Sequence, residues 1–228
     1  MNDSLGDRMK EQYEDRTRYS LPRRTYTILR LDGRAFHTYC RFLVKPFDTQ
    51  FMDDINEVAI RLCQQVQGAR FAYTQSDEIS LLLTDFDTIA SEAWFGGNIQ
   101  KIVSVGASIA TARFNSLRTS EATFDARVFT IPDPVEVENY FIWRQLDATR
   151  NSVQAVAQSL YSHKELHGKN SANLQDMIIA KSQNWNNYPI PCKRGTVICY
   201  RETQWVVESP PIFTQDRVYL QSMIPRYS

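Results

Sequence analysis

The segment that most constrains the fold runs from residue 26 to residue 36, where a strand-like run stops at Asp32-Gly33. Its β-branched and aliphatic residues suit a half-buried strand. Gly33 tolerates backbone angles that a residue with a Cβ resists, so a turn is predicted there. An acidic side chain is thereby presented beside exposed backbone N–H groups, which suits a hard cation such as Mg²⁺ with a bound phosphate. Taken alone, the pattern more often marks a strand end with a solvated Asp.

A second acidic turn changes that balance. Residues 70–75 and 78–83 read as two strands of a tight hairpin, with Ser76 and Asp77 in the turn. Between residues 51 and 66, apolar residues recur at the three- and four-residue spacing of an amphipathic helix. A helical crossover makes the first two strands parallel, so Asp32 and Asp77 are expected at the same edge of the sheet. Two carboxylates brought together in this way have the geometry that a two-metal site needs.

The remaining segments complete a βαββαβ order, with a second helix after Gly96-Gly97 and a fourth strand over residues 123–131. This order predicts an α+β, ferredoxin-like fold with both helices on one face of an antiparallel sheet. Asp133-Pro134 then starts a helix or a helix pair, and residues 196–200 with 204–207 form a terminal hairpin. We expect a core at residues 1–133 with an N-terminal extension. A helical and hairpin part at residues 134–228 is expected to pack on it as one compact unit.

Composition and charge exclude several classes of protein. The 26 basic and 26 acidic residues give a formal charge of zero, so any nucleic-acid contact must rest on local clusters. The four cysteines lack CxxC spacing and the three histidines form no HExxH motif, which argues against a zinc site and suggests a reducing cytosol. No apolar run approaches membrane-spanning length, so a cytoplasmic protein without a membrane partner is expected.

Four polar residues have both a structural and a functional interpretation. Asp48 is placed to cap the helix that follows it, and His37 is a satisfied polar residue or a ligand. Lys45 either contacts phosphate or is solvated. Lys101 falls in the first turns of a helix, where a cation does not favour the helix dipole, and this slightly favours a ligand contact.

With these motifs in view, the chain resembles the tRNA-His guanylyltransferase superfamily, the 3′-to-5′ polymerases, in its guanylyltransferase-like branch of bacterial, archaeal or phage type. The resemblance runs from about residue 26 to about residue 208 and rests on six ordered blocks. These are Arg30–His37, Lys45-Pro46 with Asp48, Tyr73 with Gln75–Glu78, Phe124–Arg127, Tyr140–Gln145 with Asp147, and Lys193–Gly195.

The resemblance implies a palm domain like that of polymerases and nucleotide cyclases, and it assigns roles to particular residues. Catalysis falls on Asp32, Asp77 and Glu78, with two Mg²⁺ ions held by Asp32, Asp77 and the Gly33 carbonyl. The nucleotide-binding positions implied are Gly33, Arg34, Ala35, Phe36, His37, Lys45, Asp48, Ser76, Lys101 and Arg127. The tRNA-binding positions implied are Arg144, Arg150, Asn151, Lys193 and Arg194.

The implied reaction adds nucleotides to the 5′ end of tRNA. The 5′-monophosphate is activated with ATP or GTP, the 3′-hydroxyl of an incoming GTP or other nucleoside triphosphate attacks, and pyrophosphate is finally removed. Each step is an in-line displacement at phosphorus. The resemblance also implies a homo-tetramer.

One block departs from the eukaryotic pattern. Where eukaryotic members carry His-Ile-Asn-Asn-Leu-Tyr-Asn, this chain has residues 149–155, in which only Asn151 matches. We therefore expect template-dependent repair of tRNA 5′ ends rather than strict dedication to tRNA-His.

Two alternatives stay open at this point. The first is a nucleotide cyclase or a forward palm polymerase, and the blocks after residue 133 weigh against it. The second is a non-catalytic RNA-binding module on a palm scaffold. Retention of both Asp32 and Asp77 argues against decay of the site.

Overall fold

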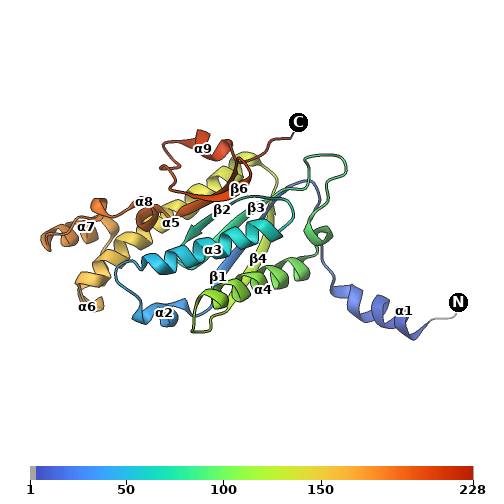
Figure 1. Ribbon diagram of the computed structural model, residues 1–228, viewed down its shortest axis with the longest axis horizontal. Helices are drawn as coiled ribbons and strands as arrows, with labels where there is room; N and C mark the ends of the chain where they lie inside the picture. The colour runs from blue at the N-terminus through green and yellow to red at the C-terminus, as the bar shows by residue number, and fades with distance from the viewer. Residues whose placement is uncertain (1–3, 228) are drawn as a thin grey trace.

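A six-stranded antiparallel sheet forms the centre of the computed structural model, which describes residues 4–227 (Figure 1). The strand order is β4-β1-β3-β2-β5-β6, and the first four strands have the order expected of a βαββαβ unit. The strands are β1 (Tyr26–Gly33), β2 (Ala69–Gln75), β3 (Glu78–Leu83), β4 (Phe124–Ile131), β5 (Thr196–Arg201) and β6 (Gln204–Glu208).

The terminal hairpin belongs to this sheet. β5 pairs with β2 from Phe71 opposite Cys199 to Thr74 opposite Thr196. The hairpin itself is confirmed, but its pairing with β2 had not been predicted. Register between strands more than a hundred residues apart is set by tertiary packing and leaves no local sequence pattern.

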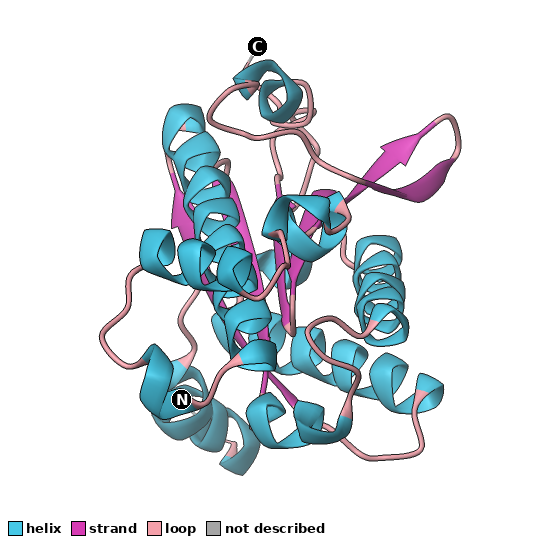
Figure 2. Cartoon of the chain, turned by 90° about the vertical axis from the view of Figure 1, so that its left-hand side faces the viewer, coloured by secondary structure: helices cyan, strands magenta, loops and turns pink. Residues whose placement is uncertain are grey.

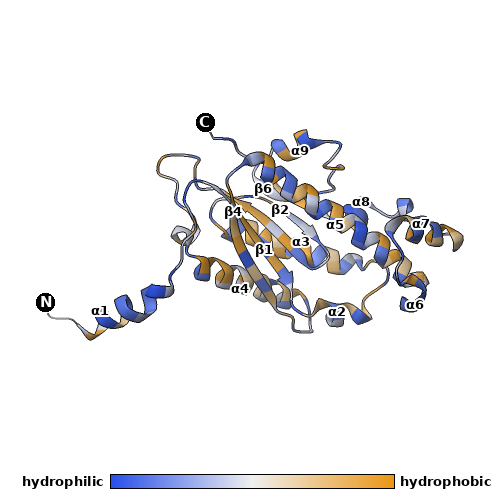
Figure 3. Ribbon diagram, turned by 180° about the vertical axis from the view of Figure 1, so that it is seen from behind, coloured by the Kyte–Doolittle hydropathy of each residue, from blue (hydrophilic) through white to orange (hydrophobic). Residues whose placement is uncertain are grey.

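One face of the sheet is covered by α3 (Thr49–Gln65) and α4 (Ile99–Leu117), as the sequence predicts. Alternate strand residues such as Leu29, Leu31 and Leu81 point into this layer, because side chains alternate across a strand. Figure 3 shows the resulting apolar strands between the helices. Asp48 caps α3, accepting a hydrogen bond from the Phe51 N–H at 2.8 Å, and this confirms the predicted helix start.

The opposite face is covered by α5 (Pro134–Leu160), a single helix rather than a pair. Asp133 caps it by accepting from the Val135 N–H at 2.7 Å, and Pro134 occupies its first turn. Its Phe141 packs on Phe71 of β2, with ring centroids 4.5 Å apart. The short helix α9 (Arg217–Gln221) adds Leu220 to the same apolar layer.

The second half of α5 belongs to a third apolar cluster, shared with the short helices that follow it (Figure 2). These are α6 (His163–Leu166) and α7 (Ser171–Ala180); the next helix, α8 (Ile190–Arg194), contacts α5 outside this cluster. Phe47, in the loop before α3, contacts Tyr188 with ring centroids 5.2 Å apart. The loop is therefore joined to the C-terminal helices.

Two further short helices lie near the N-terminus, α1 (Leu5–Met9) and α2 (Phe36–Tyr39). Figure 1 shows α1 projecting away from the sheet and its covering helices. Within residues 4–227, no helix has both the length and the apolar character needed to cross a membrane.

Candidate active site

A cavity of about 440 Å³ opens where β1 ends and the β2–β3 turn begins. Its walls come from β1, the loop before α3, the β2–β3 turn, α5 and the corner between α8 and β5. The predicted site residues that line it are Asp32, Lys45, Asp48, Ser76, Asp77, Glu78, Arg144 and Asn151.

Asp32 and Asp77 meet at this cavity, as the predicted topology requires. The β1–β3 ladder pairs Leu31 with Ile79, which leaves the two carboxylates at the same end of neighbouring strands. Burial raises the pKa of Asp77 to about 6, and the nearby charge of Asp32 adds to the rise. Within residues 4–227 neither carboxylate takes part in an ion pair. Two carboxylates thus face the cavity without an ion-pair partner.

The backbone beside both carboxylates is unusual. Ser76 and Ala35 have φ angles of 50° and 58°, in the left-handed region that residues with a side chain rarely adopt. A Cβ on Gly33 would lie 2.3 Å from the Phe36 ring, so only glycine allows that ring to pack under the loop. Phe36 is buried in the core, and it therefore fixes the loop that follows Asp32.

Glu78 differs from its neighbour Asp77 because its charge is fully paired. Nε and Nη2 of Arg144 donate to its two carboxylate oxygens, each at 2.8 Å. Arg30 Nη2 lies 2.7 Å from Oε2 of Glu78. Arg144 also donates to Asp147 at 2.7 Å, and its guanidinium lies 4.2 Å from the centre of the Trp143 ring. Glu78 is therefore a buried anchor for two arginines at the cavity wall.

These contacts bear on the predicted tRNA-binding residues. Arg144 is only 4% exposed, so it supports the cavity rather than an open RNA surface. Lys193 is also buried, and its Nζ donates to the Asn186 carbonyl at 2.6 Å. Both side chains are therefore held in buried positions by partners distant in sequence, and their contact with RNA stays a prediction. Arg150 and Asn151 are exposed, and Arg194 is half-buried.

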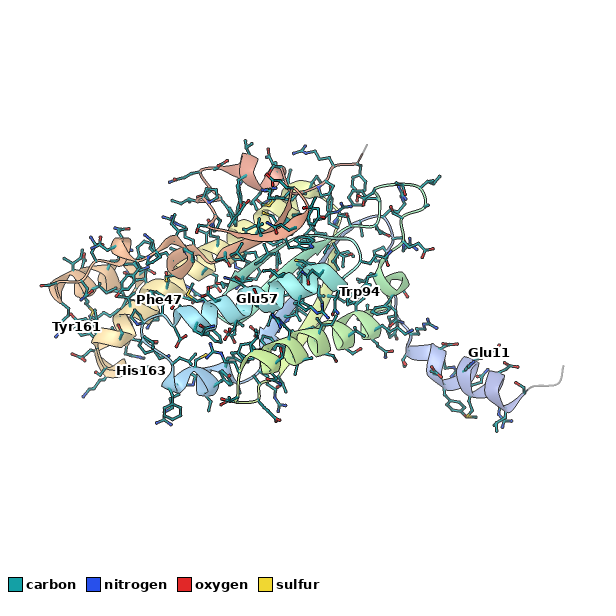
Figure 4. All side chains as sticks on the ribbon, in the orientation of Figure 1. Glu11, Phe47, Glu57, Trp94, Tyr161 and His163 are labelled. Atoms are coloured by element: carbon teal, nitrogen blue, oxygen red, sulfur yellow. The ribbon has the colours of Figure 1, made fainter. Side chains whose placement is uncertain are left out.

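Besides the loop at residues 33–37, two predicted nucleotide contacts, Lys101 and Arg127, lie outside the cavity wall. Lys101 is in the first turn of α4, which directly follows the short turn that begins at Trp94, labelled in Figure 4. The cavity end of α4 is marked instead by Phe114, whose ring packs against Phe36 at 5.5 Å. The structure therefore does not bring Lys101 to the cavity. Arg127 stands opposite Arg30, a cavity-lining residue, in the β1–β4 ladder. The side chain of Arg127 itself is largely exposed.

The other loop residues are split between core and surface. Arg34 and Ala35 are exposed after β1, and the Arg34 N–H donates to the Thr123 carbonyl at 2.8 Å. His37 is exposed and lines an adjoining groove.

Several lining residues were missed by the sequence analysis. Arg30 was recoverable, because it lies two positions before Asp32 and so on the same face of β1. Cys40 had no such signal; burial raises its pKa to about 11, and Asp77 adds to the rise. Gly195 has a φ of 72°, and a Cβ there would lie 2.1 Å from the Thr74 carbonyl oxygen. The other missed lining residues include Leu43, Met52, Gln75, Ser152 and Cys192.

The comparisons with known proteins agree on one family. The sequence profile of the tRNAHis guanylyltransferase family matches residues 6–132, more than half of the chain. An uncharacterized protein of Acanthamoeba polyphaga mimivirus is 30% identical over 87% of this chain and 77% of its own length.

Solved structures extend the similarity to nearly the whole chain. A bacterial tRNA(His) guanylyltransferase-like protein in complex with ATP is 43% identical, with a TM-score of 0.93 over 98% of this chain and all of the other. A structure of such a bacterial protein in complex with GTP is 42% identical, with a TM-score of 0.87 and the same coverage. From the profile match and these structures, supported by the paired carboxylates at the cavity, we conclude that the chain belongs to the tRNAHis guanylyltransferase family of nucleotidyltransferases.

Proposed function

We propose that this protein adds nucleotides to the 5′ end of tRNA in the 3′-to-5′ direction, with the opposite strand as template. The observation that carries the proposal is the Asp32–Asp77 pair, which has no ion-pair partner within residues 4–227, in a cavity of a fold whose bacterial relatives hold ATP and GTP. The reaction comprises 5′ activation with ATP or GTP, attack by the 3′-hydroxyl of the incoming nucleotide, and removal of pyrophosphate.

The donor set at Asp32 and Asp77 fits a hard divalent cation. Both groups are carboxylates, the ligand type that Mg²⁺ prefers, and their charges are otherwise unpaired. No group of three or more His, Cys, Asp or Glu side chains converges on one point within residues 4–227. The remaining ligands would then be the Gly33 carbonyl, water and phosphate oxygens, as is usual for Mg²⁺ with nucleotides. When bound, two Mg²⁺ ions supply stabilisation of the charge that develops on phosphate oxygens.

The chain's own groups bind and orient the reactants. In this proposal the backbone from Gly33 to His37 holds the triphosphate, and Lys45 and Ser76 contact phosphate at the cavity wall. Arg30 and Arg144, fixed by Glu78, place guanidinium N–H donors in the wall of the same cavity. Such pre-positioned donors are the main way that proteins accelerate phosphoryl and nucleotidyl transfer.

Template-dependent repair is proposed over dedication to tRNA-His because of where the departing block lies. Residues 149–155 are on α5, and Asn151, Ser152 and Ala155 of this block line the cavity. The difference from the eukaryotic pattern is thus located where it can affect substrate choice. With a template nucleotide opposite the gap, base pairing selects the incoming nucleotide without a protein group that reads it.

The proposal also includes the division into units, the oligomeric state and the location of the protein. A palm-like unit at residues 1–133 is supported by the profile match, which ends at residue 132, next to the start of α5. A homo-tetramer and a cytoplasmic location complete it, as the family resemblance implies.

A panel of 5′-truncated tRNAs tests the proposal. The tRNAs differ in the nucleotide opposite the gap, and each is incubated with Mg²⁺ and labelled nucleotides before the extended end is mapped. We expect several tRNAs to gain, at the 5′ end, whichever nucleotide completes a Watson–Crick pair. Extension of tRNA-His alone, with G added whatever the opposing base, would refute the repair proposal and leave a dedicated guanylyltransferase.

A further inference from the structure

A second groove, of about 580 Å³, adjoins the cavity between α2 and the second half of α5. It shares Lys45, Pro46 and Ala155 with the cavity, so the two spaces lie side by side along the loop before α3. A polymer that reaches the carboxylates with one end can therefore continue into this groove.

The charge of the groove is opposite to that of the cavity. His37, Arg41 and Lys45 line it, and no carboxylate is among the described residues of its wall. The cavity, in contrast, is lined by several Asp and Glu side chains. In a chain with zero formal charge, a wall with basic side chains and no acid is a local feature that suits a phosphate backbone.

An exposed aromatic ring stands beside one of these cations, Arg41, although it is not itself among the residues of the groove wall. Phe42 is 90% exposed, and the guanidinium carbon of Arg41 lies 5.8 Å from its ring centroid. The ring takes no part in the three apolar clusters of residues 4–227. A cation with an exposed aromatic ring is the usual combination for unpaired nucleic acid, because a splayed base stacks on the ring while the cation contacts phosphate.

We infer that this groove holds an unpaired stretch of the RNA substrate, with Arg41 contacting phosphate and Phe42 stacking on a base. The inference rests on the proposed function and assigns a site for RNA beyond the nucleotide. A duplex keeps its bases stacked inside, so Phe42 requires an unpaired strand. Two strands of the acceptor end offer that chemistry: the 3′ overhang and an unpaired 5′ nucleotide.

The test measures RNA affinity by fluorescence anisotropy at several salt concentrations. The variants are Phe42→Ala and Arg41→Gln, and the matched controls are Ile89→Ala, at a residue 98% exposed, and Arg61→Gln on α3. We expect Phe42→Ala to weaken binding on the order of tenfold. Arg41→Gln should weaken it and lower the salt slope by about one. The controls, the KM for ATP and the thermal midpoints should be unchanged.

Three RNAs separate the two sources of the strand: a truncated tRNA, the same tRNA without its 3′ overhang, and an overhang-free RNA with one unpaired 5′ nucleotide. If the effect of Phe42→Ala disappears when the overhang is removed, the 3′ strand occupies the groove. If it persists with the third RNA, the 5′ strand does.

Unchanged affinity of both variants for all three RNAs overturns the inference. A changed oligomeric state in Phe42→Ala with unchanged RNA affinity also overturns it, and assigns the ring to a contact with a second copy. Wild-type protein that binds RNA through the groove but adds no nucleotide refutes the proposed reaction, not the groove.

Discussion

Arg144 of α5 donates a hydrogen bond to each carboxylate oxygen of Glu78, the residue that follows Asp77 in the chain. The two side chains are 4% and 8% exposed. Because Arg30 binds the same carboxylate and Asp147 binds the same guanidinium, two cations and two anions form one buried network. This network joins α5 to the hairpin whose turn carries Asp77.

Removing Arg144 should therefore cost far more stability than removing a neighbouring surface arginine. Arg144→Met leaves the Glu78 carboxylate with one of its two arginines, and we expect a loss of about 3–5 kcal/mol in the free energy of unfolding. Arg150→Met is the control, because Arg150 binds the same Asp147 but is 68% exposed, and it should cost at most about 1 kcal/mol. Urea unfolding of both variants measures the difference. Equal losses would contradict the buried-network interpretation.

Asp77 should reduce stability in the absence of metal. Its pKa is raised from 3.8 to about 6 by burial and by Asp32, so the folded state favours the protonated form. Protonated Asp77 is tolerated in the fold, so its contribution to the free energy of unfolding is complete below pH 3.8. This contribution is lost as the pH rises through 6 and the buried carboxylate ionises. Asp77→Asn should therefore stabilise the metal-free protein at pH 7 by about 1–3 kcal/mol, a range reduced for partial solvent screening.

The measurement is urea unfolding of wild type and Asp77→Asn in a chelator, at pH 7 and near pH 4. The gain should be large at the higher pH and nearly absent at the lower one. A variant that is less stable than wild type at pH 7 would show that Asp77 makes a favourable interaction in the metal-free protein.

Loss of either carboxylate should lower activity, whereas loss of the Asp77 charge should raise the stability of the metal-free protein. Asp32→Ala and Asp77→Ala each remove a proposed metal ligand, and losses of about a hundredfold or more are expected in activation and in nucleotide transfer. RNA affinity should change little, because the proposed RNA contacts lie in the adjoining groove. Near-normal transfer by Asp77→Ala would refute the metal assignment.

Lys45 should act on the nucleotide rather than on the fold. Its Nζ donates to the Cys40 carbonyl at 2.9 Å and lies at the boundary between cavity and groove. Lys45→Met should weaken nucleotide use on the order of tenfold, the size of a lost charge-assisted hydrogen bond, while the thermal midpoint stays nearly unchanged. Steady-state kinetics with a thermal melt decide this, and a collapsed midpoint would assign Lys45 a structural role.

The carboxylate pair was predictable because it depends on chain topology alone. A right-handed crossover and a tight hairpin are enough to bring Asp32 and Asp77 to one edge, and helix caps such as Asp48 and Asp133 are local signals. Arg144 was not predictable as a buried residue, since its partner Glu78 lies 66 positions earlier and only packing brings them together. The position of Lys101 outside the cavity wall was not predictable for a related reason: it depends on the direction and length of α4, which the dipole argument ignores.

The block at residues 149–155 lies wholly within α5, and its seven residues are close to two turns of about 3.6 residues each. A block of this length can be exchanged for another without changing the phase of the helix before or after it. Val153, buried against the C-terminal helices, coincides with the Leu of the eukaryotic block, so the apolar contact is retained in such a graft. In the proposed function, the part of the chain that bears on substrate choice is therefore a helical segment that can be replaced while the carboxylates and their supporting arginines stay where they are.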